Sequence, residues 1–129
     1  MASHLLILDT SIWIEYLKNN QNYFHEVRKL LESGEVLAVD CVFGELLQGA
    51  KNIYEVNIIL DFWKHLPKED YGNVIVKAGV YSSEKKLLDK GVGLIDAIIL
   101  MHGIKSNSKI WTLDKKFYKI IPKEFRYVE

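Results

Sequence analysis

The chain has 129 residues, enough for one folded domain with one core and too few for two. Hydrophobic residues make up 49% of the chain and charged residues 26%, a balance that excludes a disordered chain and indicates a soluble globular protein. The formal net charge is zero, so the overall charge gives no indication of a nucleic-acid partner.

The chain shows no sign of export or membrane insertion. Its single cysteine, Cys41, excludes an internal disulfide and favours a reducing compartment. The first apolar run, Leu5 to Leu8, is shorter than the roughly 7–15 apolar residues of a secretory signal and the roughly 20 of a spanning helix. We therefore expect one domain over residues 1–129, located in the cytoplasm without membrane contact.

Short apolar runs alternate with helical patterns along the chain. Strands are predicted from continuous apolar residues at 5–8, 36–39 and 110–113, with a last edge strand at 126–128. Helices are predicted after residue 9, near 24–31, over 41–50, near 58–63, over 73–90 and 94–104, and briefly after 113. This alternation predicts an α/β domain of three layers, with a mainly parallel central sheet flanked by helices.

The basic residues gather toward the C-terminal end. Residues 102–129 contain seven Lys or Arg against three Asp or Glu, whereas residues 1–101 contain ten against fourteen. A basic strip beside an acidic body suits a protein that contacts phosphates while it holds cations. An ordinary solvated lysine face is the alternative interpretation.

Four carboxylates are expected near one edge of the predicted sheet. Asp9 and Asp114 each follow a strand directly, and the carboxyl ends of parallel strands are where functional residues gather. Glu45 lies early in the helix that leaves the second strand, and Asp96 opens the helix that leads into the 110–113 strand. Each of the three aspartates also precedes a helix, so each could simply be an N-cap.

Asp96 is the hardest of these acids to explain as an ordinary structural residue. Apolar residues surround it, and no Lys or Arg lies three or four positions away to pair with it. Burying an unpaired carboxylate costs several kcal/mol, of which a helix N-terminus offsets about 0.3–2 kcal/mol. A bound cation would offset the rest.

Two further positions in the 41–50 helix have open interpretations. Gly49 lies one turn after Glu45, where it either keeps space open beside that carboxylate or ends the helix. Asp40 is expected to cap the same helix, or to add negative charge near the site.

Carboxylate oxygens without a supporting Cys or His cluster indicate Mg²⁺ or Mn²⁺ as the metal. The histidines show no metal-ligand spacing: they are His4, His25, His65 and His102.

Four segments together resemble PIN-domain ribonucleases, especially VapC-type toxins of toxin–antitoxin pairs. They are LILDTSIWI around Asp9, ELLQG from Glu45, DAII from Asp96, and TLDKKF from Thr112 to Phe117. Each motif alone has low specificity, but the four occur in the family's order over nearly the whole chain.

This resemblance implies a metal-dependent endoribonuclease that hydrolyses RNA phosphodiester bonds. It implies a core triad of Asp9, Glu45 and Asp96 as catalytic metal ligands, and Asp114 as a fourth, more variable acid. It also implies supporting hydroxyls at Ser11 and Thr112, a homodimer, and inhibition by a VapB-like antitoxin whose tail enters the acidic groove. Lysines of the basic strip would hold the RNA backbone, the candidates being Lys109, Lys115 and Lys116.

Two other functions remain open from the sequence. Asp9 after the first strand also suits an aspartyl-phosphate phosphotransfer domain, although the second acid expected two residues later is replaced by Ser11. A catalytically silent PIN-like module that binds RNA or protein is the other alternative, and the presence of all four acids argues against it.

Overall fold

The computed structural model describes residues 5–129, so the prediction made for His4 lies outside the described residues. Within that range no helix combines the length and apolar character needed to cross a bilayer. The elements, in chain order, are β1 (Leu6–Leu8), α1 (Thr10–Leu17), α2 (Gln21–Glu32), α3 (Asp40–Gln48), α4 (Ile53–His65), α5 (Val74–Lys85), η1 (Leu88–Lys90), α6 (Leu94–Ser106), β2 (Lys109–Trp111), α7 (Lys115–Ile120) and η2 (Lys123–Phe125).

β1 and β2 form the centre of a parallel sheet. Ile7 pairs with Ile110, and both side chains are fully buried, as expected for strands covered on both faces. Isolated parallel bridges extend the sheet on either side, and they are Leu6 to Val36, Ala38 to Lys68, and Ile110 to Arg126. The strands predicted at 36–39 and 126–128 are therefore present only as isolated bridges, two in the first segment and one in the second.

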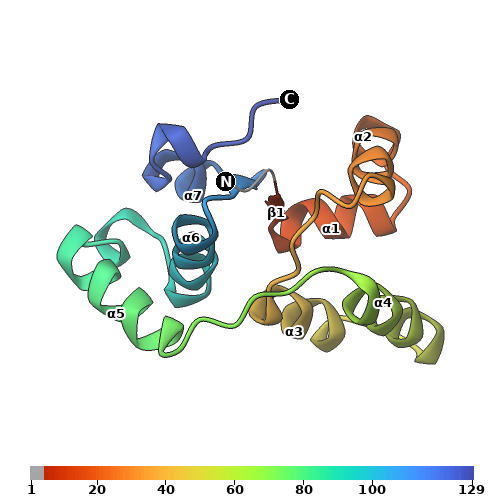
Figure 1. Cartoon of the computed structure of the whole chain (residues 1–129), viewed down its shortest axis with the longest axis horizontal. Helices are drawn as coiled ribbons and strands as arrows, with labels where there is room; N and C mark the ends of the chain where they lie inside the picture. Colours follow the sequence, from red (N-terminus) through yellow and green to blue (C-terminus); the bar gives the residue numbers. More distant parts are fainter. Residues whose placement is uncertain (1–4) are drawn as a thin grey trace.

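Helices cover the sheet on both faces. Figure 1 shows α5 and α6 on one side of β1, with α1 and α2 on the other. The predicted three-layer α/β fold is thus confirmed. α6 is buried along most of its length, from Ala97 to Gly103, because it packs between the sheet and α5. α3 connects the helices on the two sides of the sheet, since it contacts α1 and α4 as well as α6.

The helix predicted over 73–90 is interrupted, and this part of the prediction was wrong. α5 ends at Lys85, and Lys86 adopts a left-handed conformation with φ of 56°. The turn places Leu87 in the core, where it is 1% exposed. After η1, Gly91 has φ of 79° and the Cδ of Lys116 would lie 2.9 Å from any Cβ there. Glycine is favoured at this position by its left-handed backbone conformation, and the flexible Lys116 side chain packs against it.

Candidate metal and active site

Asp9 is buried at the junction of β1 and α1. Its Oδ1 accepts hydrogen bonds from the backbone N–H groups of Ser11 (3.0 Å) and Ile12 (3.4 Å), so it caps α1. The hydroxyl of Ser11 also donates to Oδ1, and the hydroxyl of Thr112 donates to Oδ2. Burial raises the pKa of Asp9, and these hydrogen bonds oppose the rise.

The loop after β2 orients the two hydroxyls toward Asp9. The N–H of Leu113 donates to Ser11 Oγ at 3.1 Å, and the N–H of Asp114 donates to Thr112 Oγ1 at 3.0 Å. A hydroxyl that accepts from the backbone in this way keeps its own proton for Asp9. Ser11 and Thr112, predicted as supporting hydroxyls, thus both hydrogen bond to Asp9.

Glu45 lies on the exposed side of α3, where a hydroxyl from α1 holds it. Thr10 Oγ1 donates a hydrogen bond to Glu45 Oε1 at 2.6 Å. Thr10 directly follows Asp9, so one short segment contacts two of the four acids. Sequence reasoning missed Thr10, and its position next to Asp9 was the only signal available.

The ends of α3 differ from the sequence prediction at Asp40. Val39 is the N-cap, and Asp40 is the first helical residue with no capping hydrogen bond, so its predicted cap role was wrong. The helix ends at Gln48 with Gly49 as its C-cap. Burial, together with the charges of Asp40 and Glu45, raises the pKa of the Cys41 thiol to about 12. The thiol is therefore protonated at neutral pH and is not a nucleophile.

Asp96 is the third residue of α6 and is half-buried. Burial is the largest cause that raises its pKa to about 6, followed by the negative charges of Asp9, Asp114 and Glu45 in that order. The other three predicted acids therefore lie within electrostatic range of Asp96. Asp96 is not an N-cap, because Gly93 occupies that position.

Asp96 is less enclosed than its apolar sequence neighbours suggested. Leu94 and Ile95 are 48% and 37% exposed, so the helix presents its first turn to solvent. The carboxylate is therefore accessible to a ligand while remaining partly desolvated.

Asp114 is exposed and caps α7. Its Oδ1 accepts from the N–H groups of Lys116 (2.9 Å) and Phe117 (3.1 Å). No hydrogen bond among the described residues ends on its Oδ2. The N-cap interpretation thus holds for Asp9 and Asp114. Oδ2 of Asp114 is left for a ligand, whereas Oδ2 of Asp9 already accepts from Thr112.

The four acids have no compensating cation in residues 5–129. None of the ion pairs found there involves them. Nor do any three Asp, Glu, His or Cys side chains in this range stand close enough to surround one metal ion. Their chemistry nevertheless fits Mg²⁺, which binds hard oxygen donors and commonly uses one or two carboxylates with several waters.

The fold separates the three lysines predicted to hold RNA. Lys115 and Lys116 form the first turn of α7, directly after Asp114. Lys109 is the first residue of β2, so it lies at the opposite end of that strand from the acids. The geometry therefore supports Lys115 and Lys116 as neighbours of the site, and not Lys109.

His102 is buried in α6, two turns beyond Asp96. It borders a hollow with Asp40, Glu69 and Asp70, and its Nε2 has no hydrogen-bond partner among the described residues. Burial lowers the pKa of His102, although those three acids oppose the change. Lys68 also lines the hollow, so its charged lining is three acids and one lysine, a negative balance that disfavours an anionic ligand.

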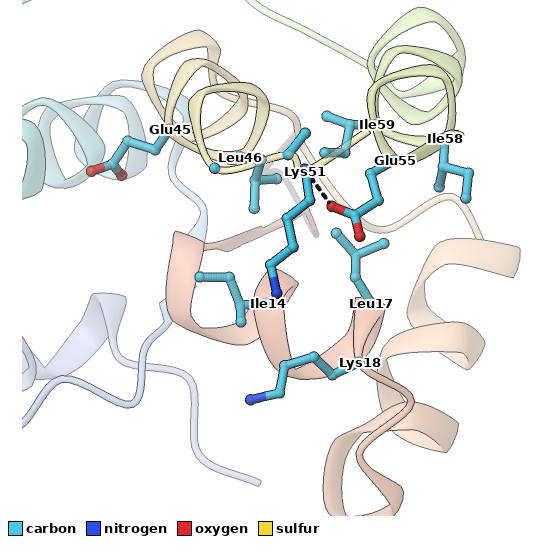
Figure 2. Close-up of a pocket in the computed structure, with 11 residues that line it drawn as sticks. Ile14, Leu17, Lys18, Glu45, Leu46, Lys51, Glu55, Ile58 and Ile59 are labelled. Carbon is cyan, nitrogen blue, oxygen red and sulfur yellow. Dashed lines mark hydrogen bonds between the residues drawn. The ribbon is translucent and has the colours of Figure 1, made fainter. Parts of the chain in front are cut away.

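A mainly apolar groove runs beside Glu45. It has a volume of about 330 Å³ and lies between α1, α3 and α4. Figure 2 shows Glu45 at one end, its carboxylate turned away from Leu17 and Ile58. The side chains of Lys18 and Lys51 also border the groove. Glu55 lines it as well, so the two lysines are balanced by two glutamates, and a mainly apolar segment would fit the groove.

Comparison with known proteins identifies the fold family. The PIN domain family model matches residues 6–121. The chain is also similar to a chain in the crystal structure of VapBC2 from Rickettsia felis bound to a DNA fragment from their promoter. That similarity has 25% identity and a TM-score of 0.71, and it covers 95% of this chain and 96% of the other. No curated protein matches the chain. As the four sequence motifs predicted, the chain belongs to the PIN-domain family.

Proposed function

We propose that this protein is a metal-dependent endoribonuclease, the VapC-like toxin of a VapBC-like toxin–antitoxin pair in the cytoplasm. One observation carries the proposal: half-buried Asp96 has a pKa raised first by burial and then by the charges of Asp9, Asp114 and Glu45, and no ion pair in residues 5–129 involves any of these acids. Carboxylates gathered in this way are stable together when divalent cations neutralise them.

Asp9, Glu45, Asp96 and Asp114 would hold Mg²⁺ or Mn²⁺. The bound cation would supply a water of lowered pKa and stabilise charge on the leaving oxygen of the phosphodiester. No histidine base is required, because the acids serve as ligands.

The surrounding residues fix those ligands in place. Ser11 and Thr112 donate to opposite oxygens of Asp9, so they favour its ionised form and fix its plane. Thr10 does the same for one oxygen of Glu45. Lys115 and Lys116 lie beside Asp114 and would attract the phosphates of RNA that the acids alone would repel.

A VapB-like antitoxin is the proposed protein partner. The similar solved structure is a VapBC complex, and the groove of Figure 2 leads from apolar side chains to Glu45. A partner segment in that groove would lie beside Glu45, one of the four acids, and would restrict access to it. We also propose a homodimer through α5, whose Ile75, Val76 and Val80 are 58%, 66% and 54% exposed.

The test is cleavage of single-stranded RNA by the purified full chain with MgCl₂, with MnCl₂ and with a chelator. Cleavage should require the metal, and Asp96→Asn or Glu45→Gln should reduce its rate at least about 100-fold while the protein stays folded. The matched control is Asp89→Asn, an exposed acid of η1, which should cleave as the parent does.

Two results would contradict the proposal. Metal-independent cleavage, or unchanged cleavage by Asp96→Asn, would show that the acids are not the metal site. RNA binding by the parent without new RNA ends would instead identify a silent PIN-like binding module.

A further inference from the structure

Four lysines from three segments line one hollow next to α7. It has a volume of about 440 Å³, and its basic residues are Lys85 from α5, Lys90 from η1, and Lys116 and Lys119 from α7. Tyr81, Leu87 and Ile120 complete its lining, and no carboxylate is among the lining residues.

The fold brings these lysines together by specific packing. The left-handed turn at Lys86 ends α5 and redirects the chain so that Lys90 faces α7 across the hollow. The side chain of Lys116 lies against Gly91, at which an added Cβ would be 2.9 Å from its Cδ and 3.3 Å from its Nζ. The ammonium of Lys85 lies 5.9 Å from the ring centroid of Tyr81, which also lines the hollow.

The charge of the hollow is not neutralised within residues 5–129. None of the ion pairs in that range involves its four lysines. Like charges held near one another repel, so an anionic ligand would stabilise this arrangement. Several lysines beside an aromatic ring are also the usual composition of a surface that follows single-stranded nucleic acid.

The hollow adjoins the acidic site through the start of α7. The N–H of Lys116 donates to Asp114 Oδ1 at 2.9 Å, while the side chain of the same residue lines the hollow. A strand whose phosphate is bound among the acids could therefore continue directly into the hollow.

We propose that the four-lysine hollow binds backbone phosphates of single-stranded RNA next to the bond that is cut. This inference rests on the proposed ribonuclease function and deepens it, because it assigns the path by which the substrate leaves the acids. Lys85, Lys90 and Lys119 are thereby added to the RNA-contacting residues, and none of them was indicated by the sequence motifs.

The experiment measures binding apart from cleavage. Fluorescence anisotropy with a labelled single-stranded RNA would be recorded in an Asp96→Asn background, over a range of KCl concentrations at constant MgCl₂. Each phosphate contact adds about −0.7 to the slope of log K against log salt concentration. The double variant Lys90→Gln/Lys119→Gln should therefore flatten the slope by about 1.4 and bind about 25-fold more weakly at about 0.1 M KCl.

The matched control is Lys29→Gln/Lys105→Gln, which removes two exposed lysines that do not line the hollow. It should bind within about two-fold of its parent, since non-contacting surface charges are screened at this salt concentration. Equal affinity of the two double variants would overturn the inference, as would an equal loss of affinity for duplex DNA. Neither result affects the ribonuclease proposal, which the separate cleavage assay of the parent decides.

Discussion

Replacing Asp96 by asparagine should stabilise the metal-free protein at neutral pH. Burial and three nearby carboxylates raise the pKa of Asp96 from 3.8 to about 6. That difference corresponds to about 3 kcal/mol between the two protonation states, and solvent screening of a half-buried group reduces it to about 1–2 kcal/mol. Asp96→Asn removes this cost, so its free energy of unfolding should exceed that of the parent by about 1–2 kcal/mol.

The gain should depend on pH in a defined direction. The pKa of Asp96 is higher in the folded chain than in the unfolded chain, so the ionised carboxylate is destabilising wherever it is charged in both states. The advantage of Asp96→Asn should therefore be complete above about pH 6. It should shrink as the pH falls toward about 4, and be absent below that, where both states of the parent are protonated.

Denaturant unfolding with a chelator present would measure the effect. Tryptophan fluorescence should report it well, because Trp13 and Trp111 are buried and become exposed on unfolding. Addition of MgCl₂ should stabilise the parent more than Asp96→Asn, since binding to the folded state alone raises its stability. The reasoning is refuted if Asp96→Asn is no more stable than the parent in chelator, or if the control Asp89→Asn gains as much.

Four further substitutions test other parts of the structure. Thr112→Val should lower the free energy of unfolding by about 1–3 kcal/mol and slow RNA cleavage, because Asp9 loses a donor while the side-chain shape is kept; unchanged values for both would remove Thr112 from the site. Burial lowers the pKa of His102 below 6.5, so the parent should lose stability as the pH falls through about 6.5, and His102→Leu should weaken that loss in unfolding measured at several pH values. Gly103→Ala should lower the melting temperature and cost about 1–3 kcal/mol, because its Cβ would lie 2.8 Å from a side chain of β2. Gly44→Ala, which meets no atom within 4 Å, should instead stabilise the protein by about 0.5–1 kcal/mol.

The parts of the site that follow from strand order could be predicted from the sequence. An apolar run that ends at Asp9, and another that ends before Asp114, place both residues at one edge of a parallel sheet. The observed register pairs Leu8 with Trp111, which brings Asp9 beside Thr112. Pairing of these two short strands fixed the positions, and their continuous apolar runs were sufficient to find them.

The parts that depend on packing between distant helices could not be predicted. The pattern from 73 to 90 is continuously helical, and only the burial of Leu87 explains why a lysine turns left-handed before it. The exposure of Leu94 and Ile95, and hence the partial burial of Asp96, depends on what covers the start of α6. The bond from Thr10 to Glu45 joins two helices, so no local pattern indicates it.

Asp9 and Asp114 are helix N-caps as well as residues of the acidic site, whereas Asp96 and Glu45 cap no helix. Loss of activity during evolution would therefore remove the reason to keep Asp96 and Glu45, but folding would still favour an acid or its amide at the other two positions. Among diverged copies of this chain, an intact Asp9 is thus a poor guide to nuclease competence. The presence of both Asp96 and Glu45 should distinguish active nucleases from inactive relatives that keep the fold.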